Sequence, residues 1–102
     1  MKLNLFCAPC SESENSPLEK YYQLIDTAQN LQLNVGYAES IEAYLEVAKF
    51  AEENEFEYRK IVIGYEEASL MLFYIDKIRS IECFKNTINI YIKHGDINKA
   101  IQ

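Results

Sequence analysis

Turn-forming residues are scarce in this sequence. Its 102 residues include only three glycines and two prolines. A fold made entirely of β-strands needs many tight turns, and these residues form a large share of such turns. The length suits one compact domain rather than two, and apolar residues make up 49% of the chain, which is enough to form a core. The composition therefore favours a single helical domain.

Basic residues are outnumbered by acidic residues. The chain has 10 lysines and arginines against 16 aspartates and glutamates, which gives a net charge of −6. Nucleic acid would be repelled over most of such a surface, and any anionic partner would have to meet a local basic patch. We therefore expect no nucleic-acid partner.

Cysteine is sparse, and its odd count of three is typical of a protein from a reducing compartment. Cys7 and Cys10 match the C-x-x-C form of redox and zinc sites, but no strand or βαβ unit surrounds them. The other soft ligands, Cys83 and His94, are eleven residues apart on one predicted helix. They would lie roughly 16 Å apart and cannot share one metal. We expect neither a metal nor another cofactor.

Residue patterns of known active sites are absent too. The only histidine, His94, has no nucleophile or acid that the sequence places beside it. The glutamates at 52, 53, 55 and 57 fall at a predicted turn, where solvated charge is common. There is no glycine-rich phosphate loop. The sequence therefore predicts a protein that is not an enzyme.

Long apolar runs are missing. The longest uninterrupted one, Leu70–Ile75, is far shorter than the roughly 18 residues that a membrane-spanning helix needs. The apolar stretch near Met1 is also shorter than the roughly 7–15 residues of a secretion signal core. We therefore expect a cytoplasmic protein.

Four stretches show the spacing of apolar residues that is typical of amphipathic helices. The first has a strong start signal, because Ser16 can cap the helix, Pro17 suits its first position and Glu19 completes a capping box. At the other end of the pattern, Lys93-His94-Gly95 is typical of a helix end. The predicted helices begin near Leu18, Tyr37, Glu57 and Lys77.

The domain organisation follows from these helices. Residues 1–15 are predicted to be a flexible segment, apolar and then polar, and residues 16–102 to be one helical-repeat domain. The third helix is apolar on nearly all sides, so we expect it in the middle, covered on several sides. Residues 97–101 are interpreted as the start of a fifth helix, so the domain is predicted to belong to a longer solenoid.

An internal repeat is the most informative feature. Ser40-Ile41-Glu42-Ala43-Tyr44 returns 40 residues later as Ser80-Ile81-Glu82-Cys83-Phe84, and Ala28 matches Ala68. Small residues would allow close helix approach, and Tyr44 and Phe84 would fill the space one turn later. The pattern predicts an all-α fold in which antiparallel helix pairs stack as a right-handed solenoid like that of tetratricopeptide repeats (TPRs). The period exceeds the usual length of about 34 residues, and chance similarity between two copies is the alternative.

The layout resembles the N-terminal part of the soluble NSF attachment proteins (SNAPs). The similarity covers residues 5–102 and is greatest from Cys83 to Asp96. It implies an adaptor that binds a SNARE bundle at membranes for disassembly by the NSF ATPase, which would need a C-terminal part that this sequence lacks. It also implies peripheral membrane contact by Leu3, Leu5 and Phe6, which match an exposed apolar loop of the family.

The chain departs from the SNAP pattern in its basic residues. Phe73-Tyr74 and Asp96 stand where the family often has cations, so Lys77 and Arg79 are the candidate partner-binding residues. The alternative function is a generic TPR-like scaffold that binds a peptide in a groove.

The fourth predicted helix has apolar residues on more sides than one neighbour can cover. Either a further helix covers them or another copy of the chain does. The sequence therefore predicts self-association through this helix in the absence of further repeats. The apolar residues concerned are Ile78, Ile81, Phe84, Ile88, Ile90, Tyr91 and Ile92.

Overall fold

The structure, a computed structural model, describes residues 16–95 and is all-helical over that range. It contains four helices and, among the residues described, no strand. The predicted helix starts are confirmed to within one residue. The predicted flexible segment and the predicted fifth helix lie outside the described range. The helices are α1 (Pro17–Asn34), α2 (Tyr37–Glu53), α3 (Tyr58–Ile75) and α4 (Lys77–Lys93).

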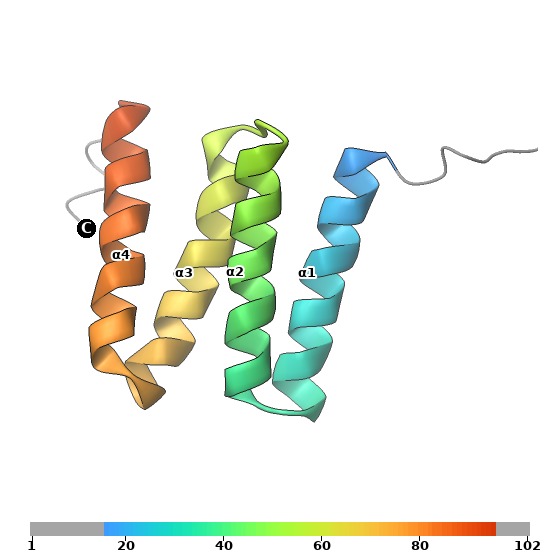
Figure 1. Ribbon diagram of the computed structural model, residues 1–102, viewed down its shortest axis with the longest axis vertical. Coiled ribbons are helices and arrows are strands. Elements are labelled where there is room, and N and C mark those ends of the chain that lie inside the picture. The colour runs from blue at the N-terminus through green and yellow to red at the C-terminus, as the bar shows by residue number, and fades with distance from the viewer. Residues whose placement is uncertain (1–15, 96–102) are drawn as a thin grey trace, which may run out of the picture.

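The helices lie side by side in chain order, each antiparallel to the one before it (Figure 1). Close backbone contacts join α1 to α2, α2 to α3 and α3 to α4. No other pair of the four described helices makes such contacts. The all-α class is therefore confirmed, with a layer of neighbouring helices rather than a closed bundle.

Local capping interactions set the helix boundaries. At the start of α1, the Ser16 hydroxyl accepts the Glu19 N–H at 3.2 Å, and the Glu19 carboxylate accepts the Ser16 N–H at 3.2 Å. This is the capping box that the sequence predicts. Asp76 caps α4 by accepting the Arg79 N–H at 3.2 Å. After α4, Gly95 has φ +82°, a left-handed conformation that glycine adopts without strain.

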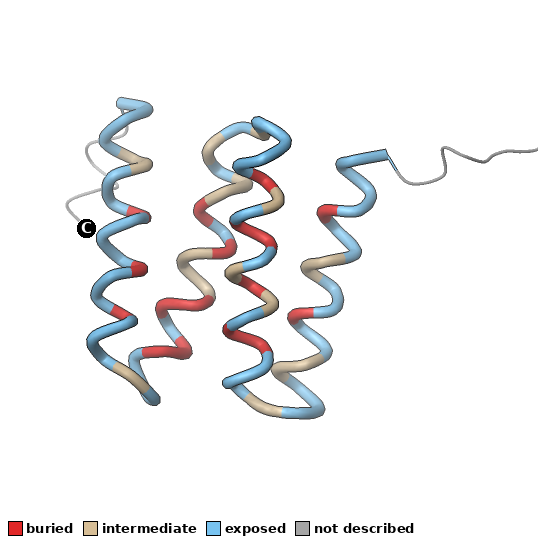
Figure 2. Tube along the Cα trace, viewed as in Figure 1, coloured by how far each residue is buried: buried red, intermediate tan, exposed pale blue. Residues whose placement is uncertain are grey.

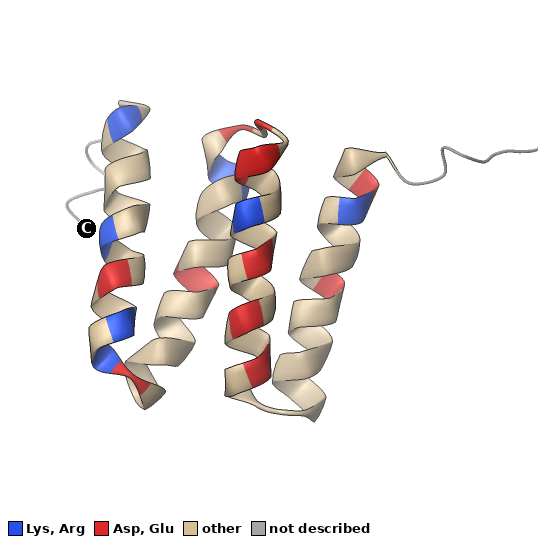
Figure 3. Cartoon of the chain, viewed as in Figure 1, with Lys and Arg blue, Asp and Glu red and all other residues tan. Residues whose placement is uncertain are grey.

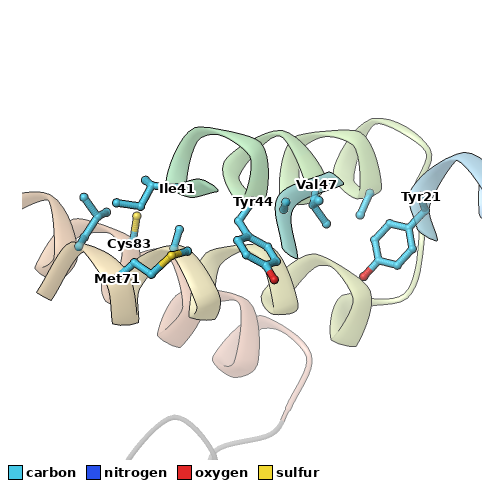
Figure 4. Packing of buried hydrophobic residues seen from close by; sticks show 10 residues of the cluster. Tyr21, Ile41, Tyr44, Val47, Met71 and Cys83 are labelled. Atoms are coloured by element: carbon cyan, nitrogen blue, oxygen red, sulfur yellow. The ribbon is translucent and has the colours of Figure 1, made fainter. Parts of the chain in front are cut away.

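The core lies mainly between α2 and α3, and Figure 4 shows buried side chains from both helices meeting there. The side chain of Tyr21 reaches this region from α1. It is fully buried, and its hydroxyl donates to the carbonyl of Lys60 at 2.7 Å. Its ring packs edge-on against Phe56, with centroids 5.5 Å apart. Tyr21 therefore links α1 to the start of α3, although these two helices make no close backbone contact.

At Gly64 the backbone of α3 lies very close to that of α2. A Cβ added there would lie 2.5 Å from the Tyr44 carbonyl oxygen and 2.7 Å from the Ala48 backbone nitrogen. Real Cβ atoms do not come so close to backbone, so α3 can only cross α2 in this position because residue 64 has no side chain.

Each of the two helix pairs, α1 with α2 and α3 with α4, contains a buried hydrogen bond from a serine hydroxyl. Ser40 in α2 donates to the carbonyl of Ala28 at 2.8 Å, and Ser80 in α4 donates to the carbonyl of Ser69 at 2.9 Å. Both serines are buried, so each hydroxyl is satisfied while its small size lets the paired helix approach. Each repeated serine therefore bonds to a carbonyl of the preceding helix, although the acceptor in the second pair is one position beyond Ala68, the match of Ala28.

Two packing predictions are wrong in part. The helix expected to be covered on several sides, α3, does lie between α2 and α4, but Leu70, Phe73 and Tyr74 on it are more than half exposed. Tyr44 is buried as predicted, whereas Phe84, its match in the second pair, is 37% exposed. Both discrepancies have one physical reason, which is that no described element packs on the outer side of α3 and α4.

Candidate protein-binding face

One side of α4 is apolar and exposed. We call it the α4 outer face, and its members recur every three or four residues, so they line one side of the helix. Figure 2 shows that most of α4 is exposed, in contrast to α2. The residues directly before three members of this face, Ser80, Cys83 and Thr87, point to the adjacent side of the helix and are buried against the rest of the molecule. The outer face consists of Ile78, Ile81, Phe84, Ile88 and Ile92, which are 73%, 54%, 37%, 37% and 52% exposed.

A groove adjoins this face at the end where α3 turns into α4. It has a volume of about 500 Å³ and is lined by Leu70, Phe73 and Tyr74 of α3 and by Phe84 of α4. All four lining residues are apolar or aromatic. Exposed apolar surface of this kind, continuous over two helices, is characteristic of sites that bind other proteins.

The two predicted partner-binding residues, Lys77 and Arg79, lie in the first turn of α4. The Lys77 ammonium nitrogen is 5.3 Å from the centroid of the Phe73 ring. Arg79 donates from its guanidinium to the Glu42 carboxylate at 3.0 Å. That hydrogen bond is the main cause of the raised pKa of Arg79. Lys77 is therefore better placed than Arg79 to meet a partner in the groove.

Charge is distributed unequally between α2 and α4. The α2 helix carries five glutamates and one lysine, whereas α4 carries Lys77, Arg79, Lys85 and Lys93 with Glu82 as its one acid. Figure 3 shows the acidic residues along α2 and the basic residues along α4. The protein as a whole is acidic, yet the helix that carries the apolar face is basic.

The residues weighed as catalytic or metal ligands are dispersed in the structure. Cys83 is buried beside α2 and α3, and burial raises the pKa of its thiol. His94 stacks on the ring of Tyr58, with centroids 4.7 Å apart. Glu52 accepts a hydrogen bond from the Tyr65 hydroxyl at 3.1 Å. Over residues 16–95, no three His, Cys, Asp or Glu side chains gather as metal ligands would.

The groove residues on α3, Leu70, Phe73 and Tyr74, are the part of the site that sequence reasoning missed. Leu70 and Tyr74 belong to an apolar run that was expected to be covered. The repeat holds a usable signal, because 40 residues earlier the matching positions are Asn30 and Asn34, both exposed on α1. A position that is polar and exposed in one repeat, and apolar in the next, points to a surface that serves binding rather than the core.

The predicted membrane-contacting residues Leu3, Leu5 and Phe6 lie outside the described range. Within that range, no helix is both long enough and apolar enough to cross a bilayer. No protein-family model, curated protein or solved structure matches this chain.

Proposed function

We propose that this protein is a non-enzymatic scaffold that binds another protein through the α4 outer face and the adjoining groove. The observation that carries the proposal is the exposure of five apolar side chains on α4 beside a groove lined by Leu70, Phe73, Tyr74 and Phe84. Leaving this much apolar surface in water opposes solubility, and a bound partner would remove it from water.

The scaffold is proposed to be a right-handed solenoid of the TPR type. Support comes from the matching halves of the chain. The first helices of the two pairs, α1 and α3, both have 18 residues, and the second helices, α2 and α4, both have 17. The buried hydrogen bonds of Ser40 and Ser80 are also alike. Stacked pairs of this kind present extended surfaces for protein partners.

The particular function proposed is that of a SNAP-type adaptor that engages SNARE complexes at membranes for disassembly by the NSF ATPase. Support comes from the sequence resemblance and from Lys77, whose ammonium group lies at the groove where an acidic helical bundle could meet it. Leu3, Leu5 and Phe6 would add peripheral membrane contact. The alternative is a generic TPR-like module that binds one short peptide.

A titration separates these two functions. Fluorescently labelled chain is mixed with an assembled SNARE bundle and, separately, with the unassembled component helices, with and without lipid vesicles. A SNAP-type adaptor binds the assembled bundle and gains affinity from vesicles, whereas a peptide module binds single helices equally well without lipid. Lys77→Glu should weaken bundle binding, and Lys49→Glu on α2 is the matched control. A chain that binds neither form at high micromolar concentration contradicts both functions.

A further inference from the structure

We propose that the α4 outer face binds a single amphipathic helix of a partner protein, antiparallel to α4, with acidic side chains beside its apolar stripe. This inference rests on the proposed scaffold function and adds the form and charge of the partner.

In the first pair, the equivalent surface is covered by a helix. Ile41, Tyr44 and Ala48 of α2 are 2%, 3% and 0% exposed, because α3 crosses them with Gly64 against Ala48. Their matches 40 residues later on α4 are Ile81, Phe84 and Ile88, at 54%, 37% and 37%. The α4 outer face is thus the surface that α3 covers on α2, with no described helix over it.

This equivalence fixes the form of the partner. The α3 helix runs antiparallel to α2 (Figure 1), so a helix in the same position on the second pair runs antiparallel to α4. The position of Ala48 on α2 is held on α4 by the larger Ile88. The partner helix therefore lies further from α4 than α3 lies from α2, and it needs no glycine where it crosses. Its apolar side chains would enter the groove between Phe73 and Phe84.

The charge of the partner follows from two lysines on the α4 outer face. Lys77 and Lys85 are eight residues apart and, at 100° per residue, project from the same side of α4 as the apolar residues, interleaved with them. Both lysines are exposed. A helix with Glu or Asp about two turns apart along its flanks would meet these ammonium groups, whereas a lysine-flanked helix would be repelled.

A second copy of the chain fits this face less well. An antiparallel pairing of two α4 helices that matches Ile78 with Ile92 is centred on residue 85, so the Lys85 ammonium groups of the two copies face each other. Like charges at the centre of an interface oppose association. The charge of α4 therefore favours a different, acidic helix over a second copy.

The experiment uses the full chain and designed peptides of about 18 residues, measured by fluorescence anisotropy. One peptide has a leucine stripe with glutamate flanks, a second has the same stripe with lysine flanks, and a third is a scrambled form of the first. We expect the glutamate-flanked peptide to bind about tenfold more tightly than the lysine-flanked one. The scrambled peptide should not bind.

Variants locate the site. Ile81→Ser and Ile88→Ser should each weaken binding about tenfold, whereas Leu33→Ser, an exposed apolar residue on α1, should have no effect. Lys85→Glu should reverse part of the preference between the two charged peptides, and Lys49→Glu should not. Circular dichroism checks that each variant is folded, which is expected because every substituted side chain is at least one-third exposed.

Each contrary outcome has a distinct meaning. Equal affinity for the two charged peptides overturns the assigned charge, and binding that survives Ile88→Ser overturns the assigned face. If the chain forms a dimer that Ile88→Ser abolishes and that the peptide cannot dissociate, a second copy of the chain occupies the face. If removal of residues 96–102 makes the peptide bind more tightly, the chain's own C-terminal segment occupies the face. If SNARE bundles bind but no peptide does, this inference fails and the proposed function stands; if neither binds, both fail.

Discussion

At the scale of single residues, Gly64 carries the clearest prediction. A glycine-to-alanine substitution at an exposed position of a helix generally stabilises a protein by about 1 kcal/mol, because alanine has the higher helix propensity. Here the new Cβ would meet the Tyr44 carbonyl and the backbone of Ala48. We therefore expect the opposite sign, a loss of about 1–3 kcal/mol in urea unfolding.

Gly95→Ala is the comparison for this test. No atom lies within 4 Å of a Cβ at residue 95, so the substitution costs only the strain of a positive φ, about 1 kcal/mol. A stabilised Gly64→Ala variant would show that α2 and α3 are further apart than described.

Two tyrosine side chains make stability depend on alkaline pH. Desolvation by burial raises the pKa of Tyr21 to about 12 and that of Tyr65 to about 12, from the ordinary tyrosine value of 10.0. The folded state then holds the phenol protons more tightly than the unfolded state does. The stability from this difference is fully present below pH 10 and is lost as pH rises from 10 through 12.

Urea unfolding at pH 8 and pH 11 tests this. The chain should lose stability at pH 11, and Tyr21→Phe should lose less between the two values, although it is already weaker at pH 8 without the hydrogen bond to Lys60. Equal losses in both proteins would show that Tyr21 ionises normally in the folded chain.

At the scale of helices, matching residues of the two pairs should contribute differently to the free energy of unfolding. Ile41→Ala should cost about 2–4 kcal/mol, because it opens a cavity under α3. Ile81→Ala, the same change 40 residues later, should cost less than about 1 kcal/mol, because that side chain is half in water. Chemical denaturation of the two variants side by side measures the difference. Equal costs would mean that both surfaces are covered in solution.

The sequence was sufficient to predict the helices but not which faces they bury. Capping residues such as Ser16 and Gly95 act locally, so helix boundaries could be predicted from nearby residues alone. The exposure of Phe73 and Phe84 depends on whether a further helix lies over them, and apolar periodicity is the same in either case. Lys77 was chosen from sequence and lies beside the groove, whereas Arg79 is engaged by Glu42, 37 residues away, a contact that no local pattern indicates.

At the scale of the whole molecule, the untested prediction of self-association can be separated from partner binding by salt. Two α4 helices bring Lys85 against Lys85, so salt screens a repulsion and should strengthen any dimer. An acidic helix is attracted by the same lysine, so salt should weaken its binding. Sedimentation velocity of the chain at about 50 mM and 500 mM salt measures the first effect. A dimer that dissociates in high salt would show that attraction between opposite charges holds it.

The chain-order packing of the helices has a consequence for folding. Close backbone contacts join only neighbouring helices in the described range, so most native contacts are local in sequence and folding should be fast, on the millisecond scale or below. Among the described helices, α1 packs on α2 and α4 packs on α3. In the described range α3 is the one helix packed on α4, so hydrogen exchange should begin in α4 while α2 and α3 remain protected. A partner helix that slowed exchange in α4 would do so by suppressing the local unfolding of α4, without changing the fold.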